Sequence, residues 1–279
     1  MLFVFIVVTG VFIFLLLLER IVPLRSVKHS LFKRLFINFC VTALAFVANA
    51  AIVQPAAQIV MQWTQQQSLG LIHIVVLPAV IESAMFPNRV AQGVIAFLLM
   101  DLTFYYWHRA NHRFPLLWRF HNVHHIDPDL DVSTGFRFHF VEIVLSAGFR
   151  VLQVALIGVS VETYIIYELV FQINTLFHHS NVRLPLGVER LLNMILVTPR
   201  MHSIHHSQVQ QETNSNFSVV FSWWDRLHQT LHFNFFQSEI DIGVPAYSSF
   251  DDNQLQHILI MPFQKQRDYW HRRDDTSAV

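Results

Sequence analysis

Residues 90–125 read VAQGVIAFLLMDLTFYYWHRANHRFPLLWRFHNVHH. The first part, residues 90–107, carries a single charge, at Asp101, and is long enough to cross a bilayer as one helix. Five histidines follow directly after it. An apolar span that leads straight into a histidine cluster predicts a membrane protein that holds metal close to the membrane surface.

The histidines are crowded into one part of the chain. Of 17 histidines, 11 fall between His108 and His206. In HRANH, His108 and His112 are four residues apart, which places both imidazoles on one face of a helix. HNVHH at 121–125 and HSIHH at 202–206 each offer three further ligands. These eight histidines exceed the three protein ligands of a typical catalytic zinc, so the number indicates two metal ions.

Two looser elements add to the supply of imidazoles. FHHSN contains His178 and His179, and RFHFVE contains His139. Because the only cysteine is Cys40, a thiolate iron–sulfur centre and an internal disulfide are excluded. Imidazole suits iron, zinc, copper and nickel, so the ligand type leaves the metal open.

The composition of the whole chain agrees with a membrane location. Hydrophobic residues make up 53% and charged residues 14%, against about 25% charged in an average soluble domain. Lys plus Arg and Asp plus Glu are equal at 19 each, so no overall positive field attracts nucleic acid. We therefore expect a membrane and no nucleic acid among the partners.

The N-terminal part predicts two further spans. Residues 2–18 are uncharged and read as an anchor, and residues 35–53 form a second span that is interrupted at Gln54–Pro55. Between them lies a basic loop, which the positive-inside rule places in the cytoplasm. Its basic residues are Arg20, Arg25, Lys28, Lys33 and Arg34.

The remaining segments complete the expected architecture. Residues 71–86 are apolar but short, and a re-entrant path for them would bring the histidine region out in the cytoplasm. Residues 141–177 suggest a helical hairpin around Gly158. We predict an all-α integral membrane bundle of about four to five spans with a cytoplasmic, histidine-rich helical cap. Its N-terminal transmembrane region is 1–107, and its catalytic region is 108–279.

Six segments, in order, resemble the fatty acid hydroxylase and sterol desaturase superfamily of membrane di-iron oxygenases. They are DLTFYYWHRANH, LLWRFHNVHHIDPD, GFRFHFVE, FHHSN, TPRMHSIHH and WWDRLHQT, from Asp101 to Thr230. The resemblance implies two iron ions and O2 as co-substrate. It implies as iron ligands His108, His112, His121, His124, His125, His202, His205 and His206, with His179 as the ninth and His139 as a candidate tenth.

Several polar residues are candidates to support these ligands. Asp127 is expected to accept a proton from the far ring nitrogen of a ligating histidine. Asp101 lies two helical turns before His108, as a functional charge or as the partner of an arginine. Asn216 is expected to reach a metal through water or to orient a ligand.

Another pair is left open by the sequence. Arg137 and Glu142 can bind each other across one helical turn, or they can orient His139. Both readings need only local spacing, so the sequence does not separate them.

The expected activity is hydroxylation or desaturation of a C–H bond in a lipid such as a sterol or a fatty acyl chain. Electrons must come from a separate cytochrome, ferredoxin or reductase, because the chain has no Rossmann glycine fingerprint and no haem-attachment motif. The alternative is a membrane zinc-dependent lipid hydrolase. A short chain without a fused cytochrome domain suits a bacterial inner membrane.

Overall fold

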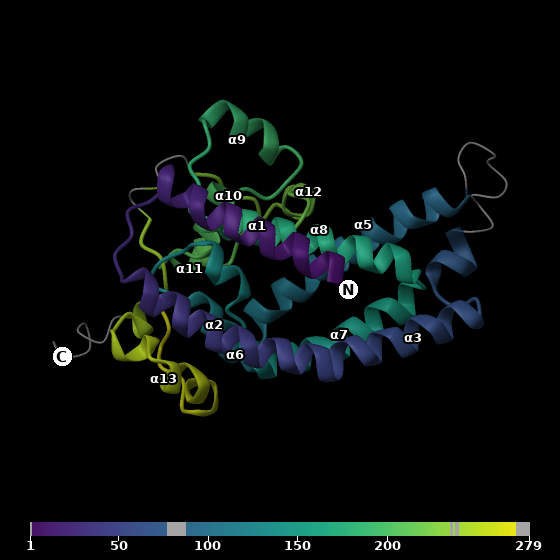
Figure 1. Ribbon diagram of the computed structural model, residues 1–279, viewed down its shortest axis with the longest axis horizontal. Helices are drawn as coiled ribbons and strands as arrows, with labels where there is room; N and C mark the ends of the chain where they lie inside the picture. The colour runs from purple at the N-terminus through teal and green to yellow at the C-terminus, as the bar shows by residue number, and fades with distance from the viewer. Residues whose placement is uncertain (1, 77–87, 235–236, 238–239, 272–279) are drawn as a thin grey trace.

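The computed structural model of the chain describes residues 2–76, 88–234, 237 and 240–271. Regular structure in these residues is helical, and the described β-contacts are isolated bridges. Figure 1 shows long helices that lie lengthwise beside one another, with shorter helices and loops gathered at one end. The predicted all-α fold is confirmed.

The N-terminal half of the bundle contains one unusually long helical run. After α1 (Leu2–Ile21), the chain forms α2 (Leu31–Ala48), the π-helix η1 (Asn49–Val53) and α3 (Gln54–Gln66) without a break. The predicted interruption at Pro55 is therefore wrong. This proline lies in the first turn of α3, where an absent N–H is tolerated, and the wide π-turn precedes it.

The helix that leads into the histidines is longer than the predicted span. After η2 (Ile72–Val76), α5 (Asn88–Arg113) continues through residue 107, so it carries both histidines of HRANH and joins the two predicted regions. It is followed by α6 (Pro115–His125). The prediction that residues 71–86 re-enter the membrane depends on 77–87, which lie outside the described residues.

Two consecutive helices occupy the segment where the membrane hairpin is predicted. α7 (Phe140–Ile157) and α8 (Val161–His179) meet at Gly158, whose φ of 74° is a left-handed conformation that favours glycine at a helix end. In the described residues four helices are long and apolar enough to cross a membrane, namely α1, Leu31–Gln66, α5 and α7. The chain is an integral membrane protein.

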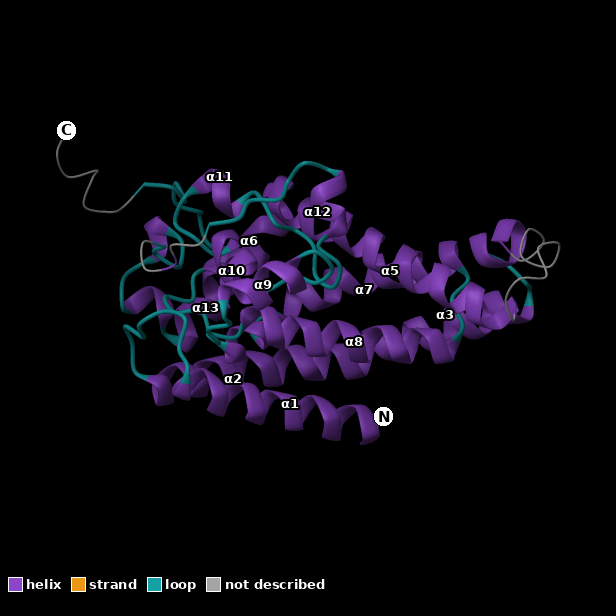
Figure 2. Cartoon of the chain, turned by 90° about the horizontal axis from the view of Figure 1, so that it is seen from above, coloured by secondary structure: helices purple, strands orange, loops and turns teal. Residues whose placement is uncertain are grey.

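Short elements form the cap at one end of the bundle, which Figure 2 shows from above. The 3₁₀ helix η3 (Val132–Phe136) connects α6 to α7. The other cap elements are α9 (Leu186–Asn193), α10 (Pro199–His205), α11 (Gln210–Thr213), α12 (Trp223–Leu227), η5 (Pro245–Tyr247), η6 (Asp251–Asn253), α13 (Leu255–Ile260) and η7 (Met261–Phe263).

Buried polar contacts join the cap to the first two helices. Glu19, near the end of α1, accepts hydrogen bonds from the backbone N–H groups of Val132, at 3.1 Å, and Asn181, at 2.9 Å. Arg34, near the start of α2, donates to Asp127 at 2.9 Å. The basic loop between α1 and α2 therefore lies at the same end of the bundle as the cap.

Candidate metal centre

Nine of the predicted ligands converge inside the cap in two groups. They come from α5, α6, α8 and α10, so four helices distant in sequence meet at this point. Within each group the candidate ligand atoms all lie within 4.8 Å of one another. The first group is His108, His112, His121, His125 and His205, and the second is His124, His179, His202 and His206.

Each histidine triplet is divided between the two groups. His121 and His125 of α6 belong to the first group, whereas His124 belongs to the second. In HSIHH the division is reversed, because the first and last histidines belong to the second group and His205 to the first. On a helix, side chains four residues apart point in nearly the same direction, whereas side chains three residues apart differ in direction by about 60°. One turn of helix can therefore supply two neighbouring ions.

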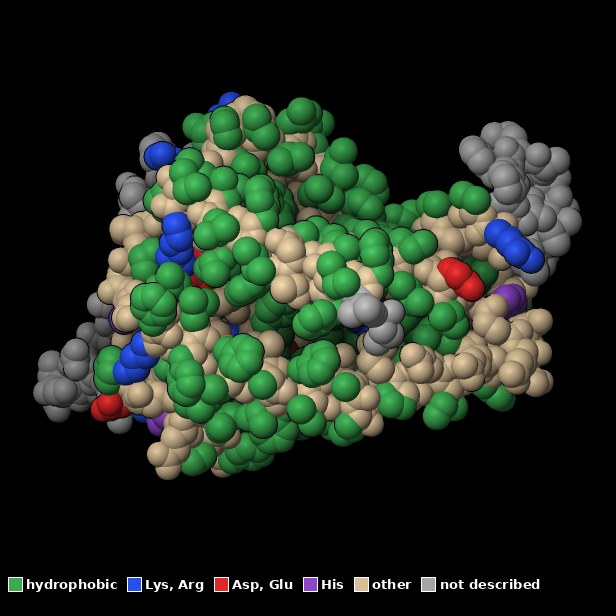
Figure 3. Space-filling view, viewed as in Figure 1, with side chains coloured by type: hydrophobic (Ala, Val, Ile, Leu, Met, Phe, Trp, Pro, Cys, Tyr) green, Lys and Arg blue, Asp and Glu red, His purple; other side chains and the backbone are tan. Residues whose placement is uncertain are grey.

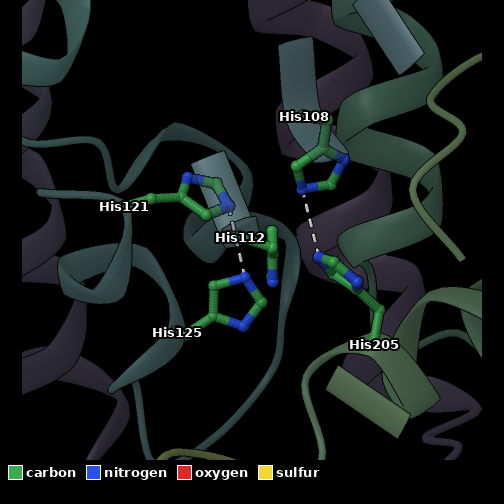
Figure 4. A group of neighbouring side chains, drawn as sticks. All are labelled: His108, His112, His121, His125 and His205. Atoms are coloured by element: carbon green, nitrogen blue, oxygen red, sulfur yellow. Dashed lines mark hydrogen bonds between the residues drawn. The ribbon is translucent and has the colours of Figure 1, made fainter. Parts of the chain in front are cut away.

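Hydrogen bonds identify the free nitrogen on two rings of the first group. The Nδ1 atoms of His108 and His205 lie 2.8 and 2.7 Å from the backbone oxygens of Phe217 and Ser215. A carbonyl oxygen only accepts, so Nδ1 carries the proton and Nε2 a lone pair in the neutral ring. These two Nε2 atoms face each other at 3.1 Å (Figure 4).

Two lone pairs at such a distance repel each other unless a cation lies between them. Imidazole nitrogens bound to one ion at about 2.1 Å and at right angles would be about 3.0 Å apart, which matches the observed spacing. His121 and His125 show a similar Nε2 to Nε2 distance of 3.3 Å. The first group therefore fits a metal ion.

The second group repeats this arrangement. His179 directs Nδ1 at the carbonyl oxygen of Thr175, at 2.7 Å, which leaves its Nε2 as an acceptor. That Nε2 lies 3.0 Å from the Nε2 atoms of both His124 and His202, and His202 lies 3.1 Å from His206. One unprotonated nitrogen thus faces two further ring nitrogens, as ligands of a shared ion do.

Burial keeps these rings in the form that binds metal. Loss of solvent lowers the pKa of His202, His205 and His206 well below its ordinary value, and neighbouring imidazoles lower it further. The rings are therefore neutral near pH 7, as metal ligation requires. Among the described residues, neither nitrogen of His112 has a hydrogen-bond partner, so either nitrogen is available to bind an ion.

A carboxylate supports the first group, and it is one whose role the sequence left open. Glu142, in the first turn of α7, lies with Oε1 2.7 Å from Nδ1 of His121. It pairs with neither Arg137 nor His139 in the described structure, where Arg137 donates to Asn38 at 3.0 Å. A carboxylate on the far nitrogen fixes the tautomer and the direction of a ligating ring.

His139 lies outside both groups. It is the residue before α7, where its Nδ1 accepts a hydrogen bond from the N–H of Val141 at 3.2 Å. Its Nε2 lies 3.3 Å from the carbonyl oxygen of Leu259. Both ring nitrogens are thus engaged with backbone, so we leave His139 out of the proposed ligand set. His178, which precedes the candidate ligand His179 in the sequence, is also outside both groups.

Asp127 binds an arginine instead of a ligating histidine. Its carboxylate accepts from Arg34 twice at 2.9 Å, from Asn38 at 3.1 Å and from Thr134 at 2.8 Å. Burial raises the pKa of Asp127, but the guanidinium groups of Arg34 and Arg137 outweigh it and leave the pKa below its ordinary value. The expected contact with a ligand is absent because the arginine of α2 saturates this carboxylate.

Asp101 and Asn216 hold backbone segments of the cap in place. Asp101 accepts from the N–H of Phe221 at 3.0 Å and from Nε1 of Trp224 at 2.7 Å, so its described partners do not include the expected arginine. Asn216 donates to the carbonyl oxygen of Met201, in α10, at 2.8 Å. It therefore supports the helix that carries ligands, and its described side-chain partners are all backbone groups.

The sequence analysis did not identify Asp225. Its two carboxylate oxygens accept from the N–H groups of Phe217, at 2.9 Å, and Ser218, at 2.8 Å. The carbonyl of Phe217 is the acceptor for His108, so Asp225 fixes the peptide that orients a candidate ligand. The motif WWDRLHQT contains Asp225, but the motif does not reveal its role, because Phe217 and His108 are 109 residues apart and meet only in the fold.

Comparison with known proteins covers the same region. A sequence model of the fatty acid hydroxylase family matches residues 93–230, which include every histidine of both groups. Ornithine lipid hydroxylase OlsE of Rhizobium tropici is 32% identical over 153 residues, 55% of this chain and 45% of its own length. Human alkylglycerol monooxygenase is 31% identical over 138 residues, 48% of this chain and 29% of its own length.

A third relative, mouse cholesterol 25-hydroxylase, is 28% identical over 165 residues, covering 58% of this chain and 54% of its own length. The chain thus spans about half, or less, of the length of these relatives. No solved structure matches it. The aligned region carries the histidine motifs and most of the helices that position them. Through residues 93–230, the chain belongs to the fatty acid hydroxylase family.

Proposed function

We propose that the chain is a membrane-bound, O2-dependent enzyme that hydroxylates or desaturates a C–H bond of a lipid at a centre of two iron ions. The observation that carries this proposal is the pair of histidine groups, in which ring Nε2 atoms face one another at about 3 Å and those of His108, His205 and His179 are unprotonated. The family match and the relatives named as hydroxylases and monooxygenases support the choice of reaction.

The proposed ligands are the nine histidines of the two groups. Iron, when bound there, would supply the redox chemistry that no side chain can, namely activation of O2 towards an unreactive C–H bond. The protein's part is to hold the nine rings together, to orient three of them through Glu142, Phe217 and Ser215, and to bury all of them except the partly exposed His112. Two ions account for nine imidazoles better than one.

The atoms of the reaction require a reductant. Hydroxylation inserts one oxygen atom of O2 into a C–H bond and reduces the other to water, which consumes two electrons and two protons. Desaturation removes two hydrogens from the substrate, reduces O2 to two waters and also consumes two electrons and two protons. We propose that a separate cytochrome, ferredoxin or reductase supplies these electrons.

A lipid is the proposed substrate class. The relatives' names specify ornithine lipid, alkylglycerol and cholesterol, which share an apolar character. In this chain α5 runs from the apolar bundle directly to His108 and His112, so a substrate in the bilayer lies close to the histidine groups. Sterols and fatty acyl chains both satisfy this description.

The chemistry of the site argues against the alternative of a membrane zinc-dependent lipid hydrolase. A catalytic zinc ordinarily has three protein ligands and keeps an open position for water. The two groups instead bring together five and four imidazoles. Because the ligand set is too large for one zinc, we retain the oxygenase as the single proposal.

We propose further that the histidine region faces the cytoplasm of a bacterial inner membrane. The backbone N–H groups of Lys28 and His29 donate to Asp129 at 3.0 and 2.8 Å, so the basic loop packs against the segment after α6. Basic loops favour the cytoplasmic side. We therefore propose that the histidine region lies on the same side of the membrane as the basic loop.

The proposed activity can be tested by product analysis. Membranes that contain the chain are incubated with isotope-labelled O2 and a reducing system, and their lipids are compared with those of the His205→Ala variant by mass spectrometry. We expect labelled hydroxylated lipid, or an unsaturated product, only with the intact chain. Products that form equally with the variant, or hydrolysed lipid without O2 uptake, would overturn the proposal.

A further inference from the structure

The short helix α9 is inverted with respect to a helix on the surface of a soluble protein. Its two fully buried side chains are polar, with Glu189 at 0% and Asn193 at 4% exposure. Its large apolar side chains face outward, as Leu191 does at 67% exposure. A helix that borders water turns its apolar face inward, so the outer face of α9 requires an apolar surrounding.

The polar face is held inward by specific contacts with the helix that carries ligands. Glu189 accepts from the backbone N–H of Arg200 at 3.0 Å and from its Nε at 2.7 Å, and Arg200 belongs to α10. Asn193 receives a hydrogen bond from Arg226 of α12 at 2.9 Å. Because these bonds fix the rotation of α9, the outward direction of its apolar face is a built feature.

The apolar surface continues from α9 onto α12. The indole Nε1 of Trp223 donates to the carbonyl oxygen of Met194 at 3.0 Å, which joins the two helices. Figure 3 shows apolar side chains covering the part of the molecule formed by α9. We call these exposed residues the α9–α12 face, which consists of Leu186, Val188, Leu191, Met194, Ile195, Trp223 and Leu227.

The α9–α12 face is linked by hydrogen bonds to two of the candidate membrane spans. Three residues before α9 begins, the chain pairs with the segment after α1, where the N–H of Arg183 donates to the carbonyl oxygen of Val22 at 2.8 Å. On the other side, Trp224 of α12 donates to Asp101, within α5, at 2.7 Å. The face is therefore attached to two candidate spans, many of whose exposed side chains are apolar.

We propose that the α9–α12 face is immersed in the lipid bilayer, at the boundary of headgroups and acyl chains in the leaflet that borders the histidine region. A helix of this kind lies in the interface with its apolar side in the acyl region, and Trp223 is the residue type that favours this depth. The occupant is lipid because the adjoining surfaces of α1 and α5 already require lipid. This inference rests on the membrane location and is independent of the proposed activity.

The contact between Glu189 and Arg200 connects the interfacial helix α9 to the ligand-bearing helix α10. α10 carries His202 and His205, and the salt bridge of 2.7 Å links it to the interfacial helix. The bilayer surface would thus hold the ligand-bearing helix at a set height above the acyl chains. A lipid carbon atom would then meet the metal centre at a reproducible depth.

The depth of the face can be measured with environment-sensitive fluorophores on single cysteines. In a Cys40→Ala background, Leu191→Cys and Leu227→Cys label the two helices of the face, and Gln210→Cys labels the exposed α11 as a matched control. The proteins are placed in phosphatidylcholine–phosphatidylglycerol nanodiscs, one chain to a disc, with lipids that carry a quenching spin label near the headgroup end of the acyl chain. A thermal unfolding transition equal to that of the Cys40→Ala parent verifies that each variant is folded.

We expect both face positions to be quenched several-fold more strongly than position 210 in nanodiscs that hold a single chain. Quenching equal to that at position 210 would overturn the inference, because the face would then lie in water. Protection from water that appears only when two chains share a disc would also overturn it, since the occupant would be a second copy. Two positions on separate helices keep the test valid if one variant fails to fold.

Discussion

At the scale of single residues, hydrogen bonds on the far nitrogens decide what the histidines can do. The backbone carbonyls of Phe217, Ser215 and Thr175 accept hydrogen bonds from the Nδ1 atoms of three rings. The Nε2 atoms of these rings therefore carry lone pairs that point inward. Neutral rings in this tautomer cannot bind one another and require a cation. A ring with a free Nε2 can therefore be a metal ligand, whereas a histidine whose two ring nitrogens both contact backbone groups cannot.

This distinction predicts different outcomes for His139 and His179. His139→Ala should retain full metal content and lose its contacts with Val141 and Leu259, of which the one at the start of α7 is worth about 1 kcal/mol by analogy with other helix caps. His179→Ala should lose metal, because its Nε2 faces two other rings. Elemental analysis of both purified variants checks the prediction, and equal metal loss in both would contradict it.

The carboxylate on His121 predicts a graded effect. Glu142→Gln keeps the shape of the side chain but replaces the charged acceptor 2.7 Å from Nδ1 of His121. Contacts of this kind typically change metal affinity by about 10–100-fold, and we expect a loss in that range. Competition with a chelator measures the affinity, with Glu162→Gln, an exposed carboxylate of α8, as control. An affinity equal to that of the control would disprove the role.

At the scale of helices, the predictions that depend on local spacing were the accurate ones. The four-residue interval in HRANH predicts one face of a helix, and both histidines of α5 belong to the same group. The division of HNVHH and HSIHH follows the same spacing, since the first and last histidines of each motif are four apart, but which motifs share an ion depends on how α6 and α10 meet. The partner of Asp127 was missed for the same reason, since Arg34 is 93 residues away.

The ion pair between Arg34 of α2 and Asp127 of the cap should contribute strongly to the free energy of unfolding. Arg34→Met leaves Asp127 as a buried carboxylate without its main partner, and removal of one member of a buried pair costs about 3–5 kcal/mol. Lys33→Met, which changes the adjacent cation above the ring of Phe250, should cost less than about 1 kcal/mol. Denaturant unfolding in detergent gives both values. Equal free energies of unfolding for the two variants would refute the prediction.

At the scale of the whole molecule, the long run Leu31–Gln66 determines the arrangement across the membrane. Its 36 residues rise about 54 Å as a helix, more than the hydrocarbon core of about 30 Å, so its two ends lie on opposite sides. Figure 1 shows α5 returning from the far end of the bundle to the cap. The return places the histidines beside the basic loop.

Labelling from outside the cell tests this arrangement. In a Cys40→Ala background, Ser26→Cys lies in the basic loop and Gln67→Cys lies just beyond α3, and both positions are exposed. We expect an impermeant maleimide to label position 67 on intact bacterial spheroplasts and position 26 only after permeabilisation. The opposite pattern would place the histidine region outside, and labelling of both positions would contradict the span.

Metal analysis of anaerobically purified protein decides whether the two histidine groups bind iron, with His124→Ala and His205→Ala as test variants and the exposed His271→Ala as control. The two test variants each remove one ring from a different group. We predict about two iron ions per chain in the intact protein and in the control, and fewer in both test variants. One zinc ion per chain, or a metal content that neither ligand substitution lowers, would contradict the account.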